Sequence, residues 1–238
     1  MIIIGDTHSI RPIFAAIDDN NIENQNIIHV GDVGIGFLSV EQDVANLQLL
    51  DRALIETNNK LYLIRGNHDF KKFWHDEQFK SSLPIFKNII FVRDYSVIEI
   101  ENKNILFIGG AISIDRSYRK RMSPSTWDED EKFVYDEEKI KGMRNIDVVI
   151  THNAPHFCPP VKFNNLVNNW HNEEFEKDKT DLKAELTQER MDFTKMWTIL
   201  RSNNNITDYI YGHFHKNSEF KKDGCIFTCL GISELKKL

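Results

Sequence analysis

Short runs of Ile, Val and Leu recur along the whole chain, and they constrain its fold more than any other feature. The runs are residues 1–4, 26–30, 60–64, 88–92, 96–100, 104–108, 146–150, 208–211 and 225–230. Most are rich in Ile and Val, and Gly, Asn or Asp residues end them, which is the pattern of short buried strands. We therefore expect a protein built around β-sheet.

Helical patterns lie between several of these runs, and residues 39–57 form the clearest one. Its apolar positions repeat at helical spacing, at Val44, Leu47, Leu50 and Leu54. Ser39 and Gln42 have the spacing of a capping box, which marks the start of a helix. Strand–helix–strand order predicts parallel crossovers, whereas residues 96–108 resemble an antiparallel hairpin. The fold class is therefore mixed α/β, with the sheet buried by helices.

The chain has 238 residues, no internal repeat and no linker, which indicates a single domain spanning residues 1–238. Residues 155–195 are the least strand-like part. Their second half has the pattern of a helix, and we expect their first half to be an irregular loop. Loops of that length in a compact domain are usually functional or disordered.

Composition excludes several classes of protein. No apolar run reaches the roughly 18 residues of a membrane span, and no signal peptide is recognisable. The three cysteines are odd in number and lack C-x-x-C spacing, which favours core thiols in a reducing compartment, so we expect a cytoplasmic protein. The net charge of -6 argues against binding long nucleic acid, although it allows a small phosphorylated substrate.

Metal-binding or proton-transferring side chains follow five of the apolar runs. They are Asp6 and His8, then Asp32, then Asn67, His68 and Asp69, then His152, and finally His213 and His215. Any one of these groups alone is more often an ordinary turn or a surface pair. The carboxyl ends of parallel strands converge on one edge of a sheet, however, so we expect all five to form one site.

The donor types indicate divalent cations. Carboxylates, imidazoles and one amide oxygen, without thiolate, suit Mn, Fe or Zn. Asp6 and His8 are two residues apart, so in extended chain their side chains would face the same side, and the same holds for His213 and His215. These ligands are too many for one ion, but they could serve two ions about 3.5–4 Å apart that share a carboxylate.

In their residues and in their order along the chain, these segments resemble the motifs of the calcineurin-like metallophosphoesterase superfamily. Its motifs appear here as "GDTH", "GD", "GNHD", "TH" and "GHFH", at residues 5–8, 31–32, 66–69, 151–152 and 212–215. The resemblance implies a four-layer sandwich in which two mixed β-sheets are flanked by helices. It also implies two metal ions at the rim of the sandwich, with Mn expected first and Fe, Zn or Ni as alternatives.

The resemblance assigns a role to each motif residue. Asp6, His8 and His215 would bind one metal, Asn67, His152 and His213 would bind the other, and Asp32 would bridge them. A hydroxide shared by the ions would attack phosphorus. His68 would protonate the departing oxygen as a general acid. The alternative is that His68 only supports the neighbouring ligand Asn67. Asp69 would orient His68.

Other segments bear on the substrate. Phosphoprotein phosphatases of this superfamily read "GD-x-V-D-R-G", whereas this chain reads "GDVGIGF" and lacks that arginine. The stretch "GGAISIDRSYRKR" at residues 109–121 makes Arg116 and Arg119 candidates for binding phosphate, unless they pair with the acidic residues at 128–131. The segment 155–195 could cover the metal edge and restrict access to small substrates.

The expected function is hydrolysis of a phosphodiester or a nucleotide-type phosphate. The alternatives are a nuclease acting on DNA or RNA, a phosphoprotein phosphatase, and a metal-supported binding module without catalytic activity. A nuclease would need a broad basic channel, which the net charge does not favour. A binding module would be expected to lack ligands or the acid, whereas every such position is filled here. The oligomeric state is left open.

Overall fold

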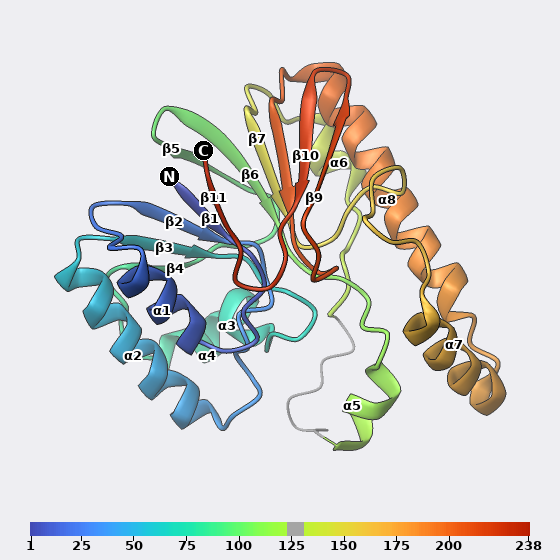
Figure 1. Ribbon diagram of the computed structural model, residues 1–238, viewed down its shortest axis with the longest axis horizontal. Coiled ribbons are helices and arrows are strands. Elements are labelled where there is room, and N and C mark those ends of the chain that lie inside the picture. Colours follow the sequence, from blue (N-terminus) through green and yellow to red (C-terminus); the bar gives the residue numbers. More distant parts are fainter. Residues whose placement is uncertain (123–130) are drawn as a thin grey trace.

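The apolar runs form two β-sheets that pack face to face, as the computed structural model of residues 1–122 and 131–238 shows (Figure 1). The first sheet has the order β11 (Leu235–Lys237), β1 (Ile2–Ile4), β2 (Asn26–His29), β3 (Lys60–Leu63) and β4 (Ile89–Phe91). The second has the order β5 (Ser96–Ile100), β6 (Lys103–Ile108), β7 (Val148–Thr151), β8 (Asp208–Tyr211), β10 (Cys225–Cys229) and β9 (Ser218–Lys222).

Both sheets are mixed. Strands β1 to β4 pair in parallel, and β11 joins the edge of β1 in the antiparallel sense. In the second sheet β6, β7, β8 and β10 pair in parallel, while β5 and β9 are antiparallel edge strands. The hairpin predicted for residues 96–108 is confirmed as β5 and β6.

Helices cover the outer face of each sheet, and others such as α5 (Arg116–Met122) and α7 (Asn165–Asp178) lie away from the sheets (Figure 1). The bounds of the other described helices are α1 (Arg11–Asp19), α2 (Val40–Glu56), α3 (Lys72–His75), α4 (Glu77–Ser81), α6 (Glu137–Lys141) and α8 (Leu182–Asn203). Helices α1 and α2 pack on the first sheet, and α6 and α8 pack on the second. The predicted capping box is present at the start of α2, where Ser39 accepts from the backbone N–H of Gln42.

Alternation along the strands separates the core into layers. Ile3 in β1 and Phe107 in β6 point into the space between the sheets, whereas their neighbours Ile4 and Leu106 point toward the helices. Because both faces of each central strand are buried, these strands are continuously apolar. The predicted four-layer sandwich of two mixed sheets flanked by helices is therefore confirmed.

The segment 155–195 differs from the expected irregular loop followed by a helix. Its first half contains α7, whose N-cap Asn164 accepts from the backbone N–H of Val167. The following helix α8 extends beyond the segment, and its Phe193, Met196 and Trp197 are buried against the second sheet. One face of α8 thus belongs to the core.

None of the helices in the described ranges combines the length and the apolar character that a membrane crossing requires.

The burial of α8 can be tested with Trp197→Ala. Trp197 is 2% exposed and packs against Tyr209 and Phe227. Removing a buried indole should lower the free energy of unfolding by about 3–5 kcal/mol, as measured by urea denaturation. Thr198→Ala, on the exposed side of the same helix, is the control and should have an effect below about 1 kcal/mol. Equal effects would contradict a core role for α8.

Candidate metal centre

The loops after β1, β2, β3, β7 and β8 bring the predicted ligands together at one rim of the sandwich. Three of these strands belong to the first sheet and two to the second, so the centre spans the junction of the two sheets. The buried ligands are Asp6, Asp32, Asn67 and His152. His8, His213 and His215 are more open to solvent.

The first group of ligands consists of Asp6, His8, Asp32 and His215. Each offers one donor atom, and these four atoms all lie within 4.8 Å of one another. The Nε2 atoms of His8 and His215 are 2.8 Å apart, and Nε2 of His215 is 3.6 Å from Oδ2 of Asp6. Such a cluster has the size and donor types of a single cation site.

The second group gathers around the amide oxygen of Asn67. Oδ1 of Asn67 is 2.9 Å from Nε2 of His152 and 2.9 Å from Nδ1 of His213. Asp32 belongs to both groups, because Oδ1 is 3.5 Å from His152 and Oδ2 is 4.0 Å from His8. One carboxylate therefore faces two clusters of donors, which is the arrangement expected of a bridging ligand.

The backbone of the ligand loops is unusual. His8, Asp32, His213 and His215 have φ of 51°, 48°, 70° and 54°, in the left-handed region. The extended chain expected around His8 and His215 is therefore wrong, and the side chains converge because the loops bend sharply. Left-handed non-glycine residues are strained and concentrate at functional sites.

Two glycines let the backbone approach the carboxylates. A Cβ at Gly66 would lie 1.8 Å from Oδ1 of Asp32, and a Cβ at Gly212 would lie 2.0 Å from Oδ1 of Asp6. Neither position could accept another residue without displacing a ligand.

Backbone groups hold the ligands in place. The N–H of His213 donates to Oδ2 of Asp6 at 2.7 Å, and the N–H of His68 donates to Oδ1 of Asp32 at 2.9 Å. Nδ1 of His152 donates to the carbonyl oxygen of Val30 at 2.8 Å. Since that carbonyl can only accept, Nδ1 keeps its proton, and Nε2, which faces Asn67 and Asp32, is the nitrogen that a cation can use once the proton on it is displaced.

Burial of ionisable groups shifts the pKa values of several residues in the cluster. Burial raises the pKa of Asp6 well above its ordinary value, and Oδ1 of Asp6 has no hydrogen-bond partner among the described residues. Burial also opposes ionisation of Asp32, but His152, His68 and His8 together lower the pKa of that carboxyl. Desolvation disfavours charge on His152 too, yet Asp32 and Asp6 raise its pKa to about 9.

These residues fit divalent cations. A buried carboxylate oxygen without a partner among the described residues, histidine ring nitrogens directed inward and glycines at the closest approaches all favour positive charge inside the cluster. Among the described residues, Asp6, His8, Asp32 and His215 would hold one ion, and Asp32, Asn67, His152 and His213 would hold a second.

A hydrogen-bond network that the sequence did not reveal orients Asn67. Nδ2 of Asn67 donates to Oγ of Ser113 at 2.8 Å, which in turn donates to Oε2 of Glu131 at 2.7 Å. The amide is thereby fixed with its oxygen toward the histidines. Ser113 lies in the stretch 109–121, which had been singled out only for its arginines.

His68 and Asp69 are placed differently from each other. His68 lines the same cavity as the ligands but lies outside both groups. The carboxylate of Asp69 accepts from the backbone N–H groups of Val33, Gly34, Ile35 and Gly66. No hydrogen bond joins Asp69 to His68, so the orienting role expected for Asp69 is corrected: it ties together the two ligand loops.

The two candidate arginines are also paired inside the protein. Arg116 forms salt bridges with Glu174 and Glu185, at 2.8 Å and 2.6 Å, and these three residues line a different cavity from the predicted ligands. Arg119 donates to the carbonyl oxygen of Asn67 at 3.0 Å and contacts Glu131 at 3.0 Å. The structure therefore brings Arg119, but not Arg116, next to the ligands. Positions 128–130 of the acidic stretch lie outside the described residues.

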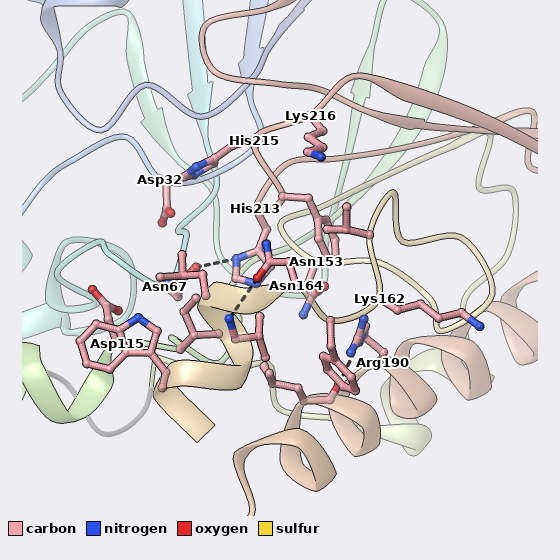
Figure 2. Close-up of a pocket in the computed structure, with 18 of the residues that line it drawn as sticks. Asp32, Asn67, Asp115, Asn153, Lys162, Asn164, Arg190, His213, His215 and Lys216 are labelled. Atoms are coloured by element: carbon pink, nitrogen blue, oxygen red, sulfur yellow. Dashed lines mark hydrogen bonds between the residues drawn. The ribbon is translucent and has the colours of Figure 1, made fainter. Parts of the chain in front are cut away.

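A cavity of about 480 Å³ opens onto the cluster (Figure 2). Asp32, Asn67, His68, His213 and His215 line one side, and the segment 161–170 with part of α8 lines the other. Its volume is in the usual range for small-molecule sites.

Comparisons with known proteins agree with this geometry. A sequence profile of calcineurin-like phosphoesterases matches residues 1–217. A dimetal phosphatase from Danio rerio is similar in structure, with a TM-score of 0.51 and 11% identity over 94% of this chain and 76% of that chain. The protein TT1561 of Thermus thermophilus is similar with a TM-score of 0.50 and 9% identity, over 97% and 89% of the two chains. No sequence among the curated proteins matched the chain.

Metal affinity should rise with pH. Below its pKa of about 9, His152 is an imidazolium with a proton on both ring nitrogens in the metal-free protein, and a bound cation must displace one of these protons. The apparent affinity for Mn should therefore increase by up to about tenfold per pH unit for each proton displaced, between about pH 6.5 and 8.5. Competition with a chelating indicator would measure it. An affinity that stays constant over this range would contradict a protonated His152.

Ser113→Ala should weaken one of the two cation sites. Without the Ser113 hydroxyl, Asn67 loses the acceptor that fixes its amide, and loss of a hydrogen bond that orients a metal ligand typically reduces metal affinity about 10- to 100-fold. Metal content after dialysis against graded free Mn would show one ion lost at lower concentration. Ser117→Ala is the control, because that hydroxyl bonds Glu174. Unchanged occupancy in Ser113→Ala would remove the orienting role.

Proposed function

The chain belongs to the calcineurin-like phosphoesterase family, and from this membership we propose that it is a two-metal hydrolase of a phosphodiester or a nucleotide-type phosphate. The observation that carries the proposal is the position of Asp32. Its two carboxylate oxygens face separate donor groups at one rim of the sandwich. A single shared carboxylate between two cation sites supports a dinuclear centre over an isolated structural ion.

Two divalent cations held there would polarise the phosphoryl oxygens and lower the pKa of bound water toward neutrality. We propose Mn, with Fe, Zn or Ni as alternatives, because the donor set of carboxylate, imidazole and amide oxygen contains no thiolate. The described cysteines, Cys158, Cys225 and Cys229, are buried.

The protein's own residues perform the remaining tasks. The phosphate would lie at the end of the cavity lined by Asp32 and His215. His68 lies beside the ligands, with its ring centroid 5.5 Å from that of His8, and we assign it the transfer of a proton to the departing oxygen. The second wall of the cavity, formed by residues 161–170 and α8, would exclude water and bulky substrates.

Features of the sequence favour this reaction over its alternatives. The loop after β2 lacks the arginine of the phosphoprotein phosphatase motif, and the net charge of -6 does not favour a nuclease. A non-catalytic binding module would have no need of His68 on the cavity wall. We also propose a cytoplasmic location, on the strength of the buried, unpaired cysteines.

His68→Ala should slow hydrolysis of esters with poor leaving groups. Loss of a general acid typically reduces the rate about 10²–10⁴-fold, and the loss should shrink for 4-nitrophenyl esters, whose leaving group needs little protonation. Steady-state kinetics on matched alkyl and 4-nitrophenyl phosphodiesters, with Mn present, would measure both effects.

Two controls accompany this variant. Metal content should stay at the wild-type level in His68→Ala, because His68 is outside both ligand groups. Asp32→Ala should lose both the metals and all turnover. Equal rates of wild type and His68→Ala on the alkyl ester would overturn the assignment of the acid.

A further inference from the structure

The cavity beside the metal ligands has a second, apolar end. Val161, Phe163, Leu166, Trp170 and Leu186 line it, from the segment before α7, from α7 itself and from the first turns of α8. Trp170 packs with Leu182 and Leu186, so this wall is anchored to the described core. An apolar surface of this kind suits the organic part of a substrate whose phosphate is held by the cations.

Arg190 brings a positive charge to this apolar end. It lies across the cavity from Asp32 and His215 (Figure 2). Its side chain is only 5% exposed, and the guanidinium carbon is 4.9 Å from the centre of the Phe163 ring. Stacking on an aromatic ring holds the planar group in one orientation.

The charge of Arg190 is not neutralised by a salt bridge among the described residues. Nε donates to the carbonyl oxygen of Leu186 at 3.1 Å, and no other hydrogen bond of the guanidinium is found in the described ranges. The adjacent Glu189 attracts it at a distance, but that carboxylate accepts from the N–H groups of Ile112 and Phe133 and from Asn153. A nearly buried arginine in this state has unmet hydrogen-bonding capacity directed at the cavity.

We propose that Arg190 binds a second anionic group of the substrate, a phosphate or a carboxylate carried by an apolar or aromatic organic group. The organic group would lie against Phe163 and Trp170, between the metal-held phosphate and the guanidinium. Lys162 and Lys216 also line the cavity, but both are exposed whereas Arg190 is buried, so we expect the guanidinium to contribute most to recognition. This inference rests on the proposed phosphoesterase function, and it narrows the substrate to a molecule with two separated anions.

Matched substrates test the inference. We would compare three 4-nitrophenyl phosphodiesters whose other ester group is phenyl, 4-carboxyphenyl or 4-phosphonophenyl, using Mn-loaded full-length protein. The leaving group is the same in all three, so differences in kcat/KM report on binding of the second group. The wild type should favour at least one acidic ester over the phenyl ester by about tenfold or more, and the two acidic esters show whether carboxylate or phosphate is the better anion.

Variants locate the effect. In Arg190→Met the preference, expressed as the ratio of kcat/KM for an acidic ester to kcat/KM for the phenyl ester in the same variant, should fall below about threefold. Arg190→Lys keeps the charge without the planar fork and should retain part of the preference. Lys195→Met is the control, because Lys195 is a half-exposed cation on the same helix. That variant should keep the full preference.

The outcomes separate this inference from the proposed function. A wild type that hydrolyses all three esters equally, or a preference that survives in Arg190→Met, would overturn the role of Arg190 and leave the phosphoesterase intact. If Arg190→Met fails to fold, the comparison of the three esters with the wild type still tests whether the protein binds a second anion. If no ester is hydrolysed, the proposed function fails, and calorimetric titration with phenylphosphonate and benzene-1,4-bisphosphonate still tests Arg190. Equal affinities of the two phosphonates would then overturn its role.

Discussion

Burial of two carboxylates at the junction of the sheets is the constraint on which the rest of this structure depends. Asp6 and Asp32 are almost completely inaccessible, at 0% and 1% exposure, in a protein interior where an isolated charge is strongly unfavourable. Backbone N–H groups and histidines compensate part of that charge, but Oδ1 of Asp6 has no partner among the described residues. Bound cations would complete the balance, and the left-handed loops and the glycines at the closest approaches leave room for them.

The sandwich explains why the centre can be built at all. Each sheet supplies parallel strands whose carboxyl ends reach the same rim, so ligands far apart in sequence meet with few intervening side chains. Asp32 comes from the first sheet and His152 from the second, and they face each other at 3.5 Å. Bound cations would therefore join the two sheets as well as supply chemistry. Specificity for the organic part of the substrate would come from the other wall of the cavity, which is formed by the segment before α7, by α7 itself and by α8.

Much of this arrangement could be predicted from the sequence, because its signals are local. Apolar runs marked the strands, Ser39 and Gln42 marked the start of α2, and the motifs after the strands named the side chains that the fold brings together at one rim. Helix α7 escaped prediction because it has few apolar residues at helical spacing, and it is held by an N-cap and by the salt bridge of Glu174 to Arg116. A local sequence pattern cannot predict the pairing of Glu174 with Arg116, because the two residues are 58 positions apart.

The residues around the ligands were hidden for the same reason. Asp69 follows His68 directly, which suggested an interaction between the two, but its partners are backbone groups some 34 to 36 residues earlier in the chain, together with Gly66. No motif in the sequence marks Ser113 or Arg190. Ser113 is noticed only through its hydrogen bond with Asn67, and Arg190 only through its contact with Phe163, and both contacts form only in the folded chain.

Whether two cations share Asp32 can be measured by anomalous diffraction from crystals grown with Mn. Two peaks are expected at the Mn edge, one among Asp6, His8, Asp32 and His215, the other among Asp32, Asn67, His152 and His213. A single peak, or none at saturating Mn, would contradict a centre in which two cations share Asp32.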